Sequence, residues 1–308
     1  MDLFSEILQA VKLRGTVYFH AGFQSPWGMK IPAGQYANYH IVTSGECWVE
    51  TDTTPQPILL QKGDMIMFPR GDSHSLVDSP HSNVVSADEL LNNPRETNSN
   101  EMVFGGSGSN SSTLICGHFE YERECPHPLF ETLPPFIHIS VKNNPNISWF
   151  TTASELAAQI SSGNSMGKDA VINRLAESLF IQALSDYIES IENISGFLAA
   201  IQDRNIGLAL KSIHDEIARD WSVAELANIA CMSKSVFSSK FHSMVGEPPI
   251  IYLARWRMLK AREMLEATTM PIKLISEKVG YQSEFSFSKA FKKMTGLTPG
   301  AVRKSVTS

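Results

Sequence analysis

Apolar residues recur with a helical period in the last third of the chain, in two copies of one pattern. In each copy two phenylalanines and a methionine stand at positions i, i+4 and i+7: Phe237, Phe241 and Met244, then Phe287, Phe291 and Met294. This spacing places the three side chains on one stripe of a helix and predicts that the stripe is buried against a neighbouring helix.

Each copy also carries signals for where its helix begins and ends. Ser233 and Ser283 stand where a side-chain oxygen accepts hydrogen bonds from the first-turn amides. Gly246 and Gly296 stand where a helix ends in a residue of positive φ. Because a shorter amphipathic stretch and a turn-sized segment precede each copy, we expect two helix-turn-helix units, at about residues 221–246 and 271–296.

A further helix is predicted between the two copies, at residues 250–266. Trp256 and Leu259 form a second apolar stripe beside a longer one, which consists of Ile251, Ala254, Met258, Ala261 and Leu265. A helix that is apolar on two sides packs on two sides, so we expect a rigid spacer. A fixed spacer matters because two recognition helices enter successive major grooves only if they are held about 34 Å apart.

The first half of the chain changes to short apolar runs cut by Gly, Pro and Asp. After an amphipathic helix candidate at residues 2–12, runs between residues 17 and 77 predict the strands of a β-sandwich or barrel. Residues 86–112 are rich in Asn, Ser and Gly and predict a mobile loop. Residues 168–192 predict a helix whose broad apolar surface packs on the sandwich or on another subunit.

Charge is distributed unevenly along the 308 residues, a length that suits two domains. The net charge is −6, but residues 208–308 carry fifteen Lys and Arg against nine Asp and Glu, a balance of +6. Residues 1–207 carry eleven against twenty-three, a balance of −12. The C-terminal part therefore suits phosphate binding through counterion release, and the acidic part needs another role.

The sequence argues against a membrane protein and against a small protein stabilised by disulfide bonds. The sequence has no apolar run of the ~20 residues that cross a bilayer and no basic and apolar leader, so we expect a cytoplasmic protein without membrane contact. The four cysteines are too few and too unevenly spaced for a disulfide scaffold. Cys231, in the first helix-turn-helix turn, is interpreted as a small core residue.

The C-terminal pattern resembles a known family. The run Gly280-Tyr281-x-Ser283-x3-Phe287-x3-Phe291-Lys292-x2-Thr295-Gly296-x2-Pro299 is similar to the second half of the DNA-binding domain of AraC/XylS-type transcriptional regulators, and residues 221–249 are similar to its first half. The resemblance covers about a third of the chain. It implies a transcriptional regulator, not an enzyme, that binds double-stranded DNA, forms a homodimer and, if an activator, contacts RNA polymerase.

A second, weaker resemblance lies in the first half. The run Gly63-x5-Pro69-x-Gly71-x2-His74 resembles the second motif of the cupin fold. If Gly45 closes the first motif, Asn38 stands at the usual glutamate position, and Gly34 and Pro32 stand at the two usual histidine positions. Three of the four metal ligands of an enzymatic cupin are then missing.

His40 and His74 remain as a predicted inward pair, because His40 lies two residues beyond Asn38 on the same strand face. Catalytic zinc typically has three protein ligands, so we favour a hydrogen-bonded pair that lines a ligand pocket. We expect no cofactor. A metal at this pair would need a further ligand from Cys116, His118 or His127.

These observations predict a two-domain α+β protein with contiguous domains. Residues 1–165 form a cupin-like sensor domain, residues 166–207 a helical dimerisation or linker region, and residues 208–308 the DNA-binding domain.

The predicted DNA contacts lie on the two recognition helices. Ser bonds several base edges, Phe285 suits thymine methyls, and Glu284 suits cytosine. Lys289 is expected to face the bases as well, whereas Lys240, Lys292 and Lys293 suit phosphates. The full set is Ser233, Lys234, Ser235, Ser238, Ser239, Lys240, Ser283, Glu284, Phe285, Ser288, Lys289 and Lys292.

Two alternatives stay open for what the sensor domain detects. One is a small-molecule effector that enters past Trp27, His40, Trp48 and His74. The other is an oxidant that reacts with Cys47, Cys116 or Cys125. A rival function for the whole chain is a metal-dependent cupin enzyme with a DNA-binding appendage.

Overall fold

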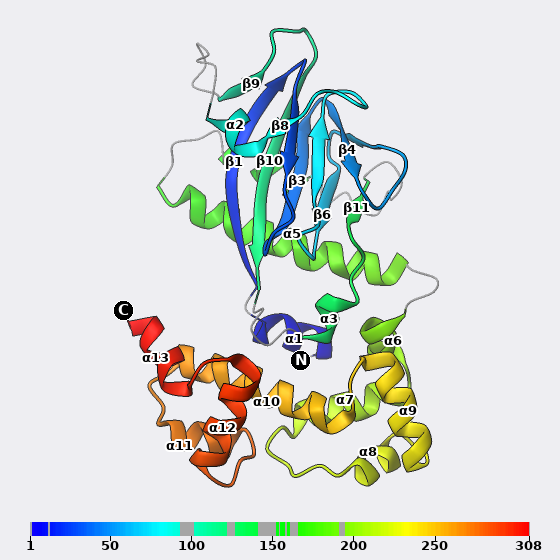
Figure 1. The fold of residues 1–308 in the computed structure, drawn as a ribbon, viewed down its shortest axis with the longest axis vertical. Coiled ribbons are helices and arrows are strands. Elements are labelled where there is room, and N and C mark those ends of the chain that lie inside the picture. Colours follow the sequence, from blue (N-terminus) through cyan, green and yellow to red (C-terminus); the bar gives the residue numbers. More distant parts are fainter. Residues whose placement is uncertain are drawn as a thin grey trace. The chain divides into compact units, whose positions relative to one another are not determined.

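The chain folds into two compact units, each made of separate pieces of sequence. The computed structural model describes residues 2–11, 13–92, 102–121, 127–140, 152–153, 155–157, 159–160, 166–190 and 195–307 (Figure 1). The sheet unit comprises Leu13–Tyr121 and Leu133–Ser190. The helical unit comprises Met1–Lys12, Glu122–Thr132 and Ile191–Ser308. The units therefore differ from the contiguous domains that the sequence predicts.

Two β-sheets form the sheet unit. Its strands are β1 (Arg14–Gln24), β2 (Gly28–Ile31), β3 (Ala37–Ser44), β4 (Glu46–Thr51), β5 (Ile58–Gln61), β6 (Met65–Phe68), β7 (His74–Val77), β8 (Val85–Ser86), β9 (Val103–Gly105), β10 (Ser111–Glu120) and β11 (Ile137–Ile139). One sheet has the order β11-β6-β3-β10-β1-β9 and the other β5-β4-β7-β2-β8. The predicted cupin-like sandwich is confirmed.

Helix α5 (Lys168–Ser190) packs on the outer face of the larger sheet, where it contacts β1 and β11. The Phe180 ring lies 4.4 Å from the Phe119 ring of β10, which in turn stacks on Tyr39 of β3 at 4.5 Å. The larger sheet is therefore covered on both faces, and Ala37 to Val42 of β3 are all buried. Of the two partners predicted for this helix, the chain's own sheet covers its apolar surface.

The prediction of a loop over residues 86–112 is wrong for most of the residues that the structure describes there. Helix α2 (Ala87–Leu91) begins at Ser86, whose hydroxyl accepts a hydrogen bond from the Glu89 amide. Strand β9 pairs in parallel with β1, with Gly22 opposite Val103. A partner so distant in sequence leaves no signal in local composition. Residues 93–101 lie outside the described residues.

The helical unit begins with the chain's first helix. Its helices are α1 (Leu3–Ala10), α3 (Pro128–Glu131), α6 (Gly196–Gln202), α7 (Ile206–Asp215), α8 (Val223–Ile229), α9 (Lys234–Val245), α10 (Pro249–Ala267), α11 (Ile272–Lys278), α12 (Glu284–Thr295) and α13 (Pro299–Thr307). The pairs α8–α9 and α11–α12 are the two predicted helix-turn-helix units, and α10 is the predicted spacer (Figure 1). No helix among the described residues has the length and apolar character needed to cross a membrane.

The predicted helix ends are confirmed in both helix-turn-helix units, and the buried stripes are confirmed at their phenylalanines, all four of which are fully buried. The third member of each stripe differs: Met244 and Met294 are partly buried, and their neighbours Val245 and Thr295 are buried instead. Ser233 and Ser283 accept hydrogen bonds from the amides of Val236 and Ser286. Helices α9 and α12 end at glycines with φ of 89° and 77°.

The apolar stripe predicted for the spacer is wrong at one position. Ile251 is 48% exposed, whereas Met258, Ala261 and Leu265 are buried. The polar residue Arg257 is buried instead, 9% exposed, because its guanidinium donates hydrogen bonds to the carbonyls of Ile217 and Arg219.

Candidate nucleic-acid interface and ligand cavity

The two recognition helices expose the predicted DNA contacts. Most of these side chains are exposed, and Ser238, Lys240 and Ser288 are partly buried. Phe285 is 80% exposed in the first turn of α12, outside the buried phenylalanine stripe. An aromatic ring so exposed gains nothing from the protein's own core, which makes it suited to contact with a base.

Val236 was not among the predicted contacts, yet it is 54% exposed in the first turn of α9, directly before the buried Phe237. Cys231 was placed wrongly. It is exposed and adopts a φ of 52°, so it forms the turn between α8 and α9 and fills no core.

The hydroxyls of Ser233 and Ser283 form hydrogen bonds within their own helices. The Ser233 hydroxyl accepts from an amide of α9, and the Ser283 hydroxyl accepts from the Ser286 amide and donates to the Ser286 hydroxyl at 2.9 Å. Their hydroxyls therefore fix the starts of the recognition helices, and any contact they make with DNA is secondary to this role.

The lysines of the two helices differ in their partners. Lys240 of α9 forms an ion pair with Asp203 at 2.5 Å, and its side chain is 33% exposed. Within the described part of the chain, Lys289 and Lys292 of α12 form no ion pair and are exposed. The second helix thus presents positive charge that is available to phosphates, while the first holds part of its charge internally.

A cavity of about 580 Å³ lies in the sheet unit. It is lined by Tyr18, Phe19, Met29, Ile31, Pro32, Ala33, Gly34, Tyr36, Asn38, His40, Ser86, Ala87, Asp88, Leu91, Cys116 and Gly117. Apolar side chains form most of this wall. Helix α2, from the segment predicted as a loop, contributes part of it. A cavity of this size and lining suits a small organic molecule.

At the cavity wall His40 lies at the centre of a chain of hydrogen bonds. His74 Nδ1 lies 2.9 Å from the Asp72 carbonyl oxygen, which only accepts, so this nitrogen carries the hydrogen. His74 Nε2 then accepts from His40 Nε2–H at 2.8 Å. His40 Nδ1 in turn accepts from the Cys116 thiol at 3.0 Å. One arrangement of neutral tautomers therefore satisfies every member of the chain.

Burial keeps these groups neutral. It lowers the pKa of His40 well below its usual value, with a further contribution from His74, and it lowers the pKa of His74 to about 4. Burial also raises the pKa of the Cys116 thiol well above its usual value. At neutral pH the site therefore contains two uncharged imidazoles and a protonated thiol.

The cavity wall does not fit a cupin metal ion. Pro32, Gly34 and Asn38, the positions of the first cupin motif, do line the cavity, but none supplies a histidine or a carboxylate. Both ring nitrogens of His40 face protein groups. Among the residues that the structure describes, no three His, Cys, Asp or Glu side chains are arranged to hold a metal ion.

The other predicted ligand contacts lie elsewhere. Trp27 is 4% exposed in the core between the sheets. On β4 the core residues are Cys47 and Val49, so Trp48 between them faces the opposite side, away from the core. His74 contacts His40 behind the cavity wall. Of the four predicted residues, His40 lines the cavity.

The residues considered as additional metal ligands are also separated. Cys116 lies beside His40. His118 pairs with Glu120 at 3.0 Å. His127 belongs to the helical unit, where its ring bonds Tyr252. Cys125 lies outside the described residues.

The N-terminal and C-terminal parts of the chain each match a known protein family. Residues 2–189 match a cupin family, and residues 226–305 match a helix-turn-helix domain family. The chain is 28% identical to a putative AraC-like transcription regulator of Streptomyces lividans, and the match covers 100% of this chain and 99% of that protein. It is 26% identical to the HTH-type transcriptional regulator AlkR of Acinetobacter baylyi, covering 99% of each chain.

A third relative is the RCS-specific HTH-type transcriptional activator RclR of Escherichia coli, which is 26% identical over 99% of this chain and 98% of that protein. The likeness therefore spans both units, and the family matches cover the residues that form the cavity and the two recognition helices. With a cupin domain over more than half of its length and a helix-turn-helix domain after it, the chain belongs to the AraC-type transcriptional regulators with an N-terminal cupin domain.

Proposed function

We propose that this regulator binds a specific duplex DNA site with α9 and α12 in successive major grooves, and that a small molecule in the cavity controls this binding. The observation that supports the DNA contact most strongly is that each recognition helix exposes one face while its two phenylalanines are fully buried. An exposed recognition helix in each of two linked helix-turn-helix units matches the geometry that reads a major groove.

Sequence readout would come from few side chains. Phe285 suits contact with a thymine methyl, Glu284 suits the amino group of cytosine, and the serines of α9 bond several base edges. Lys289 and Lys292 would contact phosphates and fix the register without reading sequence.

Selection from random duplex DNA with the full chain tests this proposal. We expect enrichment of one motif with two conserved segments about 10 base pairs apart. The variant with Phe285→Ala and Glu284→Ala should lose the preference within one segment and keep it in the other. Enrichment of no motif by the parent protein would contradict the proposal.

The cavity's chemistry suits a mainly apolar effector that carries one polar group. Phe19, Met29 and Ile31 provide apolar contact, and the Asn38 amide lies 9% exposed at the same wall. An amide supplies both a donor and an acceptor, which suits a hydroxyl or carbonyl group on the ligand. We propose ligand binding here over metal catalysis, because three of the four motif positions that would hold a metal carry no suitable donor.

A cavity-blocking substitution tests the effector site. Ala33 lines the cavity at an exposed position, whereas its neighbour Gln35 is exposed and is not part of the lining. Compounds that raise the melting temperature of the parent should fail to do so with Ala33→Trp and should still do so with Gln35→Trp. Equal shifts in all three proteins would place the ligand elsewhere.

Oxidant sensing at Cys116 is the second candidate. Its support is the position of this thiol at the cavity wall, bonded to His40. The raised pKa of the thiol opposes rapid reaction, because the thiolate is the reactive form. Reporter transcription in Cys116→Ser and Cys47→Ser strains treated with an oxidant decides between a small-molecule effector and an oxidant. If both strains respond to the oxidant as the parent does, oxidant sensing at these thiols is excluded.

We also propose a homodimer, and contact with RNA polymerase if the protein activates transcription, as expected from the family. Sedimentation of the full chain over a range of concentrations tests the dimer, since a constant monomer mass would contradict it. Transcription in vitro with purified polymerase tests activation.

A further inference from the structure

The N-terminal helix and the segment that follows the sheet both pack in the helical unit. Helix α1 contacts spacer helix α10, and α3 contacts α6. Ile7 and Val11 are fully buried there, and Leu129 is fully buried next to His127. The DNA-binding unit is thus completed by two pieces of chain from far outside its predicted boundaries.

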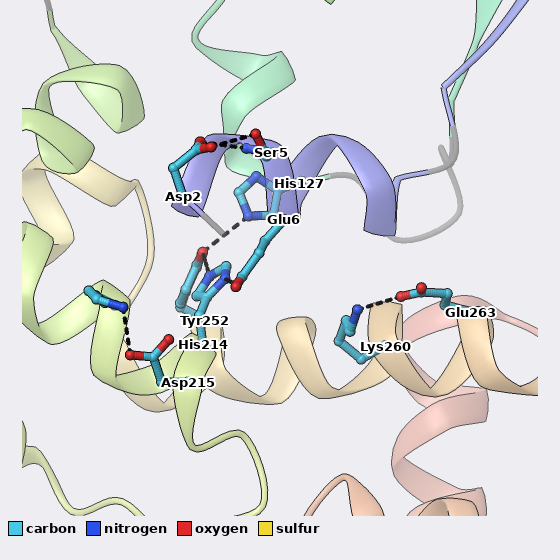
Figure 2. A network of polar contacts seen from close by, with 10 residues as sticks. Asp2, Ser5, Glu6, His127, His214, Asp215, Tyr252, Lys260 and Glu263 are labelled. Carbon is cyan, nitrogen blue, oxygen red and sulfur yellow. Dashed lines mark hydrogen bonds and ion pairs between the residues drawn. The ribbon is translucent and has the colours of Figure 1, made fainter.

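A chain of polar groups, three of them buried and one partly buried, joins these pieces to the spacer helix (Figure 2). We call it the polar chain; its members are His127, Tyr252, His214 and Glu6. The Tyr252 hydroxyl lies 3.1 Å from His127 Nε2 and 2.7 Å from His214 Nε2. His214 Nδ1 lies 3.3 Å from a carboxylate oxygen of Glu6.

One set of protons fits every contact in the polar chain. His127 Nδ1 accepts from the Leu129 amide, so His127 Nε2–H donates to the Tyr252 oxygen. The Tyr252 O–H then donates to His214 Nε2. This leaves the hydrogen of His214 on Nδ1, the atom that faces Glu6. Because each step depends on the one before, the loss of one member leaves buried groups unpaired.

Tyr252 connects the polar chain to the first recognition helix. It is fully buried in the first turn of α10, and its ring lies 5.9 Å from the Phe241 ring of α9. One turn further along α10, the Trp256 ring stacks on His214 at 3.9 Å. The polar chain therefore fixes the start of the spacer, the point at which the first helix-turn-helix unit joins it.

The same two pieces of chain lead directly into the strands of the cavity. Strand β1 follows α1, and β10 precedes the segment that begins with residue 122. The ends of these strands pair with each other, with Arg14 opposite Glu120. Both strands line the cavity, β1 with Tyr18 and Phe19 and β10 with Cys116 and Gly117.

We propose that the polar chain acts as a latch with three roles. It holds α1 and residues 127–131 on the spacer helix, and it thereby sets the separation of the two recognition helices. Through β1 and β10, ligand binding in the cavity alters the contacts of the polar chain. The last of these roles rests on the proposed function of the cavity. The first two depend only on contacts within the helical unit.

Removal of the Tyr252 hydroxyl in the full-length protein tests the latch. Tyr252→Phe keeps the ring and removes the group that joins both histidines. The DNA probe is the duplex selected with the parent, with and without one base pair inserted between its two segments. We expect the insertion to weaken parent binding at least tenfold and to weaken Tyr252→Phe binding less than threefold, measured by fluorescence anisotropy. A general loss of folding would lower both affinities and leave their ratio unchanged.

Matched variants separate positioning from a nonspecific effect. Tyr281→Phe removes a hydroxyl from a half-buried ring at the second helix-turn-helix unit and should keep the parent ratio. Glu6→Gln retains a polar oxygen beside His214 Nδ1 and should also keep the parent ratio, whereas Glu6→Leu should behave as Tyr252→Phe does. An unchanged ratio in both Glu6→Leu and Tyr252→Phe would overturn the latch.

Hydrogen exchange provides a second readout that needs neither DNA nor effector. In Tyr252→Phe we expect exchange at least ten times faster in α1, and also faster exchange at residues 14–17 and 117–120 of β1 and β10. Faster exchange in α1 with unchanged strands would overturn the link to the cavity. Failure of the parent to select any DNA would contradict the proposed function instead, and unchanged exchange in α1 would overturn the latch independently.

Discussion

The two helix-turn-helix units share one backbone plan and differ in the side chains they expose. In both, a serine caps the recognition helix, two phenylalanines are fully buried, and a glycine of positive φ ends the helix. The first exposes serines and Val236, and its Lys240 is paired with Asp203. The second exposes Phe285 and several lysines. The buried side chains thus determine how each helix packs, and the exposed side chains can differ between the two copies without changing that packing.

The units also differ in what holds them to the spacer. The first joins α10 beside the buried imidazoles of His127 and His214. Beside the second, Arg257 of α10 lies over the Tyr281 ring at 5.7 Å, while its hydrogen bonds go to Ile217 and Arg219, before the first unit. The first junction therefore contains two buried histidines, which can gain a proton in acid, whereas the contact with the second contains an arginine that stays charged.

The largest expected effect tests whether the two scaffolds are equivalent. Phe237→Ala and Phe287→Ala should each destabilise their own unit by about 3–5 kcal/mol, because each removes a fully buried ring. Denaturant-dependent hydrogen exchange of the full chain would report α9 and α12 separately. A loss below about 1 kcal/mol in either helix would show that its stripe does not support the fold as we describe.

The second prediction uses acid to separate the two junctions. Burial lowers the pKa of His214 to about 3 and that of His127 well below its usual value, while Lys260 lowers the former further and Glu6 faces it. The unfolded chain therefore binds protons below about pH 6.5 that the folded chain does not, so stability falls as pH falls.

At pH 5 one such histidine costs about 2 kcal/mol relative to neutral pH. We expect exchange in α1 and α7 to accelerate between pH 7 and pH 5, after correction for intrinsic rates, more than exchange in α11 and α12. The His214→Gln variant should lose part of this difference. Equal acceleration at both junctions would contradict the comparison.

A third prediction concerns phosphate contacts. Lys292→Ala should reduce the slope of log affinity against log salt by about 1, because one phosphate contact is lost. Lys240→Ala should reduce it less, because Lys240 already has Asp203 as its partner at 2.5 Å. Anisotropy titrations on the selected duplex at several salt concentrations measure both slopes; an equal reduction would remove the distinction between the two helices.

The smallest predicted effect concerns base readout by Phe285. Replacing one thymine of the selected site by uracil removes a methyl group, and we expect a loss of about 0.8 kcal/mol with the parent protein. The Phe285→Ala variant should bind both duplexes equally. A thymine preference that survives the substitution would assign that contact to another side chain.

Local patterns predicted the local features well. Helix caps and buried stripes depend on residues within one or two turns, so Ser283, Gly296 and Phe287 could be placed from spacing alone. Positions with apolar residues on both faces were ambiguous. In Cys47-Trp48-Val49 the alternation does not say which face meets the core, and the structure directs Trp48 away from it.

Features that depend on distant partners were not predictable in this way. The amphipathic pattern of α1 indicates a helix but not the helix on which it packs. His127 appeared as a metal candidate because its sequence neighbours include other histidines and cysteines, yet it bonds Tyr252. Arg257 is buried because two carbonyl groups far from it in sequence accept its hydrogen bonds.

Hydroxyl-radical footprinting of the full chain on the selected duplex tests the central claim most directly. If α9 and α12 enter successive major grooves, two protected segments should lie on one face of the duplex, about 10 base pairs apart. Lys292→Ala should weaken protection in one segment first. A single protected segment, or two segments on opposite faces of the duplex, would contradict the account.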